Sequence, residues 1–315
     1  MPPYAIVLII LGSIIVLFVI PHFIVSYWIF RKYFGRRSER TINNYFLYSH
    51  NYDSVRPILI KNKQDLETKG YETLIIKAYD GIELVGYYFP NNSDKTLIFF
   101  HGHHANPTGI FAYHAMGALE RGYNVLIVHE RAHFKSGGKY STFGYREQHD
   151  VISWIEAVKS KFNCKSIYLY GLSMGGTSVA LASKDFDKTV VKAIAIECAY
   201  PSIPRLIKQL ARELHVPDFL FVWTIRIYAK IFAKLSFDSF DTTKSLQFDT
   251  TPTLFIHATN DTIAIESFLK DNYDNCSSMK KDTLVIENGY HAIAVPQMGE
   301  DALNKIFEFY KEAEE

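Results

Sequence analysis

The sequence predicts an α/β protein with a mixed, mostly parallel central sheet, helices on both faces of the sheet, a helical cap insertion and a single N-terminal transmembrane helix. Three observations lead to this prediction. The first thirty residues are almost free of charge, a strand–turn–strand pattern follows a polar connector, and short apolar runs then alternate with helical patterns. A chain of 315 residues with 48% hydrophobic residues can bury a large core and is too apolar to be disordered.

The amino-terminal segment contains no Lys, Arg, Asp or Glu from Tyr4 to Phe30. A helix rises about 1.5 Å per residue, so roughly 20 residues cross the hydrocarbon core of a bilayer. We therefore assign residues 1–30 to a transmembrane anchor. The alternatives are a cleaved signal peptide, which needs a basic leader and a small-residue cleavage site, and a buried core helix, which rarely lacks charge for so long.

Basic residues follow this segment and predict its orientation. Only Glu39 opposes them, and the positive-inside rule places the carboxy-terminal bulk of a single-pass membrane protein in the cytoplasm. The basic residues are Arg31, Lys32, Arg36, Arg37 and Arg40. We interpret residues 31–70 as a juxtamembrane basic connector, with a helical pattern over 40–48.

The main domain is predicted to span residues 71–315. It opens with a β-hairpin, because two strand-like runs at 72–79 and 82–89 flank Asp80-Gly81, a two-residue turn signal. Continuous apolar runs without alternation are typical of parallel strands that are buried on both faces. Such runs occupy 96–100, 124–128, 166–170, 191–196, 253–257 and 283–286.

Helical patterns separate these runs, as in the apolar spacing of Val151, Trp154, Ile155 and Val158. One interval breaks the alternation. Residues 199–250 contain no clear strand but two apolar helical stripes, which predict a cap over the carboxyl edge of the sheet. Aromatic residues of the second stripe, Phe219, Phe221 and Trp223, are predicted to line an apolar substrate pocket.

A G-x-S-x-G motif stands at Gly171–Gly175, directly after the predicted strand 166–170 and before a helical pattern rich in small residues. A serine at the tip of a tight strand-to-helix turn needs neighbours without side-chain bulk, which glycine supplies. The turn exposes the Ser173 hydroxyl and points the Met174 amide at developing negative charge. The motif therefore predicts Ser173 as a nucleophile.

A serine nucleophile needs a base and an orienting carboxylate. Asp261 follows the predicted strand 253–257, and His291 follows the predicted strand 283–286. Loops at the carboxyl ends of parallel strands meet at one crevice, so we expect these groups to lie beside Ser173. Glu197, at the end of another predicted strand, is the alternative orienting acid.

With this order of Ser173, Asp261 and His291, the chain resembles the α/β-hydrolase superfamily over residues 71–315. The resemblance implies that Ser173 is the nucleophile, His291 the general base and then acid, and Asp261 the orienting residue. The run at 101–106 is similar to the oxyanion loop of that family, which implies backbone donation by His103 beside Met174. The run at 130–138 is similar to the loop D-x-R-G-x-G-x-S of the family, with His129 and Phe134 as departures from it.

These features predict a serine hydrolase that cleaves a small-molecule carboxylic ester, with an acyl or aromatic acyl portion, through an acyl-serine intermediate. The alternatives are an amidase or aminopeptidase-like enzyme, a thioesterase, and a catalytically idle membrane-tethered binding protein. A net charge of +1 (34 Lys+Arg against 33 Asp+Glu) and the lack of basic recognition motifs argue against a nucleic-acid partner.

We predict no cofactor and no metal. The histidines at 101, 103, 104 and 114 lack the spacing of zinc motifs, and Cys164, Cys198 and Cys276 are isolated in the sequence.

Overall fold

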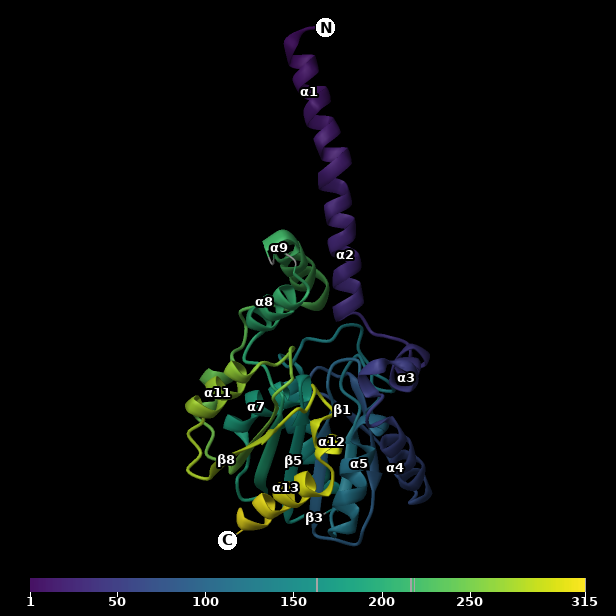
Figure 1. Ribbon diagram of the computed structural model, residues 1–315, viewed down its shortest axis with the longest axis vertical. Coiled ribbons are helices and arrows are strands. Elements are labelled where there is room, and N and C mark those ends of the chain that lie inside the picture. The colour runs from purple at the N-terminus through teal and green to yellow at the C-terminus, as the bar shows by residue number, and fades with distance from the viewer. Residues whose placement is uncertain (163, 216, 218, 315) are drawn as a thin grey trace.

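The amino terminus of the computed structural model, which describes residues 1–162, 164–215, 217 and 219–314, is one long helix that projects from the body of the protein (Figure 1). It consists of α1 (Pro3–Ile14), the π-helical turn η1 (Ile15–Val19) and α2 (Ile20–Phe34). The wider turn ends two residues before Pro21, which has no N–H for the helical ladder. This helix is long and apolar enough to cross a membrane.

The connector is helical and packs on the body. It forms α3 (Glu39–Tyr48), η2 (His50–Tyr52) and α4 (Arg56–Thr68). Leu59 and Leu66 of α4 are fully buried, and α4 packs against α5 (Pro107–Glu120). The helical pattern predicted at 40–48 therefore coincides with α3, and a second helix adds to the core.

Eight strands form one sheet in the order β1-β2-β4-β3-β5-β6-β7-β8. The pairs β1–β2 and β2–β4 are antiparallel and all other pairs are parallel, which confirms the predicted mixed, mostly parallel sheet. The strands are β1 (Glu72–Lys77), β2 (Glu83–Phe89), β3 (Lys95–Phe100), β4 (Asn124–Val128), β5 (Ser166–Leu172), β6 (Val191–Glu197), β7 (Thr253–Ala258) and β8 (Lys281–Ile286).

Two hydrophobic cores cover the two faces of the sheet. Alternate residues of β3 show this, since Phe99 belongs to one core and Ile98 to the other. The first core includes α4, α5 and α13 (Glu300–Glu312), and the second includes α6 (Glu147–Phe162) and α7 (Met174–Ala182). The remaining helices of the body are η3 (Ser183–Asp185), α11 (Glu266–Asn275) and α12 (Ala294–Met298).

The cap lies between β6 and β7, where the sequence predicted it. It contains α8 (Ile203–Glu213), α9 (Phe219–Tyr228), η4 (Ala229–Ala233) and α10 (Thr242–Leu246). Helices α8 and α9 stand above the sheet, and α9 contacts α2 directly (Figure 1). The cap therefore touches both the body and the amino-terminal helix.

Strand β5 is two residues longer than the apolar run that predicted it. The run stops at Tyr170 because Gly171 is usually a strand breaker. In the structure Gly171 pairs with Phe100 of β3 and with Ile196 of β6, and these neighbours keep it in the sheet. Ser173 therefore follows directly after the last residue of β5.

Candidate active site

Ser173 lies in a tight turn between β5 and α7 with φ 54° and ψ −111°, a backbone conformation that costs energy for a residue with a Cβ. Two glycines make the turn sterically feasible. A Cβ on Gly175 would lie 2.0 Å from the Phe100 oxygen, and a Cβ on Gly171 would lie 2.6 Å from the Gly175 oxygen. The G-x-S-x-G spacing therefore has the steric cause that the sequence suggested.

Three side chains from separate loops form a hydrogen-bonded chain. The Ser173 Oγ lies 3.0 Å from Nε2 of His291, and Nδ1 of His291 lies 2.6 Å from Oδ2 of Asp261. These residues follow β5, β8 and β7, which end at the same edge of the sheet. The structure thus brings together the three residues that the sequence singled out.

Asp261 is held in a fixed orientation. Its Oδ1 accepts hydrogen bonds of 2.8 Å from the amides of Ile263 and Ala264, which leaves Oδ2 for His291. Burial alone would raise the pKa of Asp261, but His291 and the Ala264 amide outweigh burial and lower this pKa. Asp261 therefore stays ionised at neutral pH.

The charge of Asp261 changes the pKa of His291. Burial alone would lower the pKa of His291, but Asp261, and after it Glu197, outweigh burial and raise this pKa. The imidazole is thus a stronger base than an ordinary histidine, as proton removal from a serine requires.

A second carboxylate, Glu197 at the end of β6, is buried near the same histidine. Its Oε2 accepts a 2.6 Å hydrogen bond from the Tyr170 hydroxyl, and Oε1 has no partner among the described residues. Burial raises the pKa of Glu197 to about 7, although Tyr170 and His291 oppose it. Glu197 acts on His291 through charge, whereas Asp261 holds the hydrogen bond to Nδ1.

The loop after β3 lies against the serine turn. A Cβ on Gly102 would be 3.4 Å from the Ser173 Cβ. His101 fixes the loop, because its Nδ1–H donates to the Gly102 oxygen at 2.7 Å and its Nε2 accepts from the Glu130 amide at 3.0 Å. Backbone donation by His103 and Met174 to an oxyanion stays a prediction.

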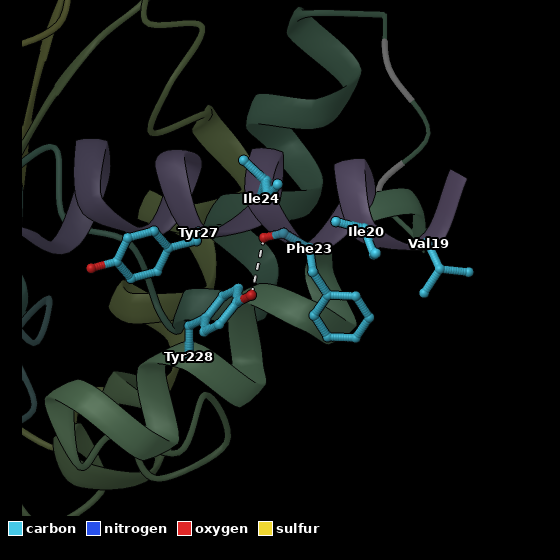
Figure 2. Close-up of a pocket in the computed structure, with 6 residues that line it drawn as sticks. All are labelled: Val19, Ile20, Phe23, Ile24, Tyr27 and Tyr228. Carbon is cyan, nitrogen blue, oxygen red and sulfur yellow. Dashed lines mark hydrogen bonds between the residues drawn. The ribbon is translucent and has the colours of Figure 1, made fainter. Parts of the chain in front are cut away.

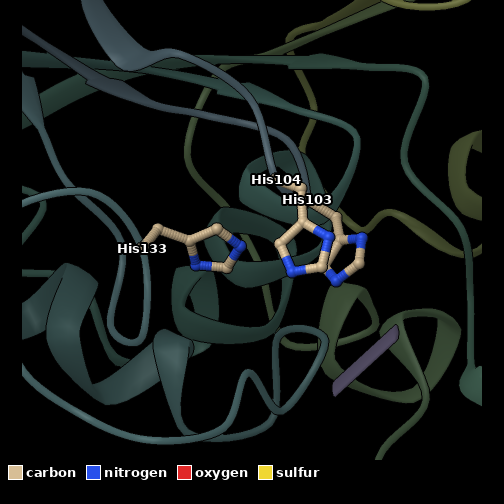
Figure 3. Close-up of side chains that lie close together, drawn as sticks. All are labelled: His103, His104 and His133. Carbon is tan, nitrogen blue, oxygen red and sulfur yellow. The ribbon is translucent and has the colours of Figure 1, made fainter. Parts of the chain in front are cut away.

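Three histidine rings cluster next to this loop (Figure 3). The Nε2–H of His103 donates to the Tyr33 oxygen at 2.6 Å, and the Nε2–H of His104 donates to the Gly35 oxygen at 3.1 Å. The rings of His103 and His104 thereby connect the oxyanion-type loop to the end of α2. This connection has no signal in the sequence, because its acceptors are backbone carbonyls.

The third ring, His133, is fully buried, and its Nε2 has no partner in the described part of the chain. Burial lowers the pKa of all three histidines, so they are neutral and suited to bind a metal ion. One nitrogen of each lies within 4.8 Å of the others. The absence of a metal therefore stays a prediction from the sequence.

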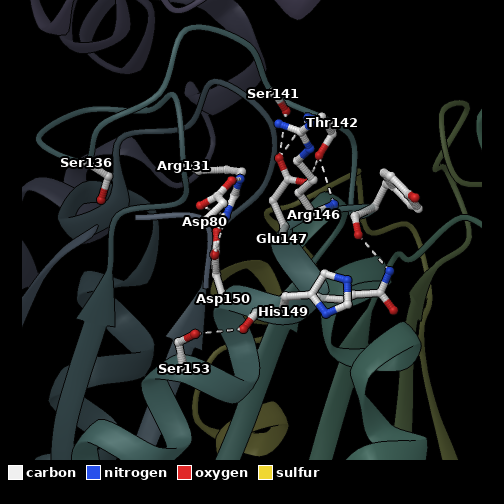
Figure 4. Close-up of polar contacts among 12 residues, drawn as sticks. Asp80, Arg131, Ser136, Ser141, Thr142, Arg146, Glu147, His149, Asp150 and Ser153 are labelled. Atoms are coloured by element: carbon white, nitrogen blue, oxygen red, sulfur yellow. Dashed lines mark hydrogen bonds and ion pairs between the residues drawn. The ribbon is translucent and has the colours of Figure 1, made fainter. Parts of the chain in front are cut away.

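A buried ion pair orders the loop after β4 (Figure 4). Arg131 donates twice to Asp150 of α6, both times at 2.6 Å, and twice to Asp80 of the β1–β2 turn, at 2.8 and 3.3 Å. Within this loop, Ala132 (φ 60°) and Phe134 (φ 43°) adopt the left-handed conformation that glycine favours. Phe134, one of the two departures from the similar family loop, therefore adopts a conformation that glycine favours.

The aromatic cap residues lie at the junction with α2. The rings of Phe221 and Trp223 stack on His22, with centroids 5.1 and 5.5 Å away, and Phe219 is exposed. Their predicted place in a substrate pocket stays a prediction.

Comparison with known proteins agrees with this architecture. Residues 63–230, just over half of the chain, match the model of the family described as X-Pro dipeptidyl-peptidase (S15 family). The uncharacterised protein YqkD of Bacillus subtilis (strain 168) is 26% identical over 226 residues, which cover 70% of this chain and 72% of that protein.

Solved structures of esterases share the fold. An esterase of Pyrococcus furiosus has a TM-score of 0.66 and 23% identity, with 79% of this chain and 93% of that chain covered. An esterase of Exiguobacterium antarcticum has a TM-score of 0.56 and 17% identity, with 76% of this chain and 100% of that chain covered.

Proposed function

The chain belongs to the X-Pro dipeptidyl-peptidase (S15) family within the α/β-hydrolase superfamily, and on this premise we propose that it is a serine hydrolase that cleaves carboxylic esters through an acyl intermediate on Ser173. Membership makes the protein a hydrolase. The observation that supports serine chemistry is the hydrogen-bonded chain from Ser173 through His291 to Asp261.

The reaction proceeds in two steps. His291 takes the proton of the Ser173 hydroxyl while Oγ attacks the acyl carbon, and Asp261 stabilises the imidazolium that forms. The amides of Met174 and His103 receive the oxyanion, and each donor of this kind contributes about 3–4 kcal/mol to the transition state. His291 then protonates the departing alcohol, and water activated by His291 releases the acid from Ser173.

A second candidate is cleavage of an amide bond, and the match to a peptidase family favours it. The same three residues perform both reactions, since ester and amide substrates pass through the same kind of tetrahedral intermediate. The choice depends on the pocket, not on the nucleophile.

Substrate series distinguish the two candidates. The full-length protein is assayed with p-nitrophenyl esters of short and long acyl chains and with X-Pro p-nitroanilides, each beside Ser173→Ala. We expect ester turnover that the variant loses by about 10⁴-fold or more. Turnover confined to anilides would select the amide candidate, and equal ester turnover in both proteins would refute serine catalysis.

We also propose that the amino-terminal helix is a retained membrane anchor and that the catalytic domain lies in the cytoplasm. A cleaved signal peptide would not carry part of the folded core, yet Ser26, Phe30 and Phe34 of α2 are buried in the protein. Carbonate extraction of membranes, with protease accessibility from each side, tests this. Release of the intact chain by carbonate would contradict the anchor.

A further inference from the structure

We propose that the outer face of the cap helix α9 and the turn η4 lies in the lipid bilayer beside the anchor, so that the cap is a second membrane contact. This inference rests on the proposed anchor and goes beyond the proposed chemistry. The partner is the lipid surface itself.

An exposed apolar stripe carries the proposal. The residues Phe219, Trp223, Ile227 and Ile231 follow at intervals of four, which places them on one helical face. Their exposed fractions are 73%, 49%, 41% and 54%. Trp223 also stacks on His22 of the anchor, but each of these side chains leaves two fifths or more of its surface exposed. A row of large, exposed apolar side chains marks a membrane or protein interface.

Polar groups show the opposite arrangement and face the anchor. The Thr224 hydroxyl lies 2.7 Å from the Ser26 hydroxyl and 3.2 Å from Nε2 of His22. The Tyr228 hydroxyl donates to the Phe23 oxygen at 3.0 Å. Polar groups satisfied between two helices, with apolar side chains turned outward, are the pattern that a hydrocarbon environment requires.

The depth of α9 suits the boundary between headgroups and acyl chains. Ser26 and His22 precede Arg31, the first basic residue after the anchor, by five and nine residues, which is about 8 and 14 Å along the helix. Interfacial helices insert their apolar face by about 5–10 Å. Helix α9 therefore meets the anchor at the depth where such helices lie.

The surroundings of the exposed stripe indicate that lipid covers it. The stripe adjoins the anchor, whose exposed apolar side chains need a bilayer in any case. An apolar groove of about 370 Å³ lies at this junction (Figure 2). It is lined by Val19, Ile20, Phe23, Ile24, Tyr27 and Tyr228, and it offers space to an acyl chain. Lys230 and Lys234 are exposed at the end of the stripe, where anionic headgroups attract cations.

The tryptophans permit a direct test. The chain contains three, of which Trp28 lies on the anchor, Trp223 lies on the stripe and Trp154 is buried in the core with 1% exposed. Full-length W28F and W223F are reconstituted in phosphatidylcholine–phosphatidylglycerol vesicles with and without brominated acyl chains. The double variant W28F/W223F retains only Trp154, and its fluorescence gives the contribution of that buried residue.

We expect brominated lipid to quench both variants. The emission of W28F should fall by up to about one half, because Trp223 is one of its two tryptophans and lies at acyl-chain depth. Aqueous acrylamide should quench the same residue weakly. I227E in the W28F protein should lose much of the lipid quenching. I75E, which changes an isoleucine on β1 that is even more exposed, should retain it.

The other outcomes overturn the inference in distinguishable ways. Quenching of W223F without quenching of W28F would leave the anchor in place and remove the stripe from the bilayer. Quenching of neither would remove the anchor as well. Protection of Trp223 from both lipid and acrylamide would show that protein covers the stripe, as in a dimer of this chain.

Discussion

The protonation of His291 depends on two carboxylates at different positions. Asp261 accepts the hydrogen bond from Nδ1, and Glu197 adds charge from the end of β6. Because their net effect raises the pKa of His291 above its ordinary value of 6.5, the pH dependence of activity reports directly on this site.

The first prediction concerns this pH dependence. His291 must be neutral to act as a base, so kcat/KM should fall as the pH drops through a value above 6.5. Asp261→Asn removes the charge that raises this pKa. The acid limb should then move to lower pH, and turnover should fall by about 10⁴-fold. A pH–rate profile with the same limb in both proteins would contradict the assignment.

Glu197→Gln gives the second prediction. This change removes the weaker of the two charges and leaves the hydrogen bond from Asp261 intact, so the variant should keep most of its activity. Because the pKa of Glu197 is about 7, its charge is partly lost on the acid side, and the acid limb of the variant should shift to lower pH by less than that of D261N. If Glu197 were the orienting acid, E197Q would lose about 10⁴-fold in turnover and D261N would keep most of its activity. Parallel pH–rate profiles of E197Q and D261N decide between these outcomes.

Sequence reasoning reached the three hydrogen-bonded residues because each stands just after a strand, where parallel topology brings loops together. It did not reach the contact of Tyr170 with Glu197 or that of His103 with Tyr33. Both depend on side chains or carbonyls from distant elements, and their distances are set by packing instead of local pattern. Motif spacing carries no information on such contacts.

At the scale of elements, the tight turn at Ser173 forms because Gly171 and Gly175 have no Cβ that would clash with the neighbouring backbone. The third prediction follows from the distance of 2.0 Å between a Cβ on Gly175 and the Phe100 oxygen. Gly175→Ala should destabilise the protein by about 3 kcal/mol or more, because the backbone of β3 has to move. Thermal unfolding of the detergent-solubilised protein measures this effect.

Gly102→Ala is the matched control. It lies in the neighbouring loop, and its Cβ would meet the nearest atom at 3.4 Å, which is an ordinary contact. This variant should unfold close to the wild-type temperature. Equal stability of G175A and G102A would contradict the geometry of the turn.

The strands and the cap were predictable as elements, and their ends were not. Apolar runs mark the buried part of each strand, but the ends depend on pairing, as Gly171 demonstrates. The connector shows another limit. The helix α4 has a mostly polar sequence, and packing of Leu59 and Leu66 stabilises it.

At the scale of the whole molecule, the amino-terminal helix and the α/β body form one folded unit. The sequence places the end of the anchor at residue 30, yet Phe30 is fully buried and stacks on Phe34. Composition alone locates the charge-free run. It does not reveal that the last turns of this run also pack on the cap.

The fourth prediction compares two truncations. Deletion of residues 2–18 removes only exposed apolar helix and should leave a folded, active enzyme in detergent. Deletion of residues 2–30 also removes Ser26 and Phe30, exposes the cap, and leaves Thr224 without its partner Ser26. The longer deletion should aggregate or unfold at lower temperature. Equal melting temperatures would show that α2 contributes nothing to the fold.

The most direct measurement for the central proposal is covalent trapping of the nucleophile. The full-length protein is treated with a fluorophosphonate, digested, and mapped by mass spectrometry, with S173A as the control. Ser173 should carry the phosphonyl adduct, and S173A should carry none. A folded wild-type protein that hydrolyses esters without an adduct on Ser173, or with the adduct on another residue, would contradict the proposed mechanism.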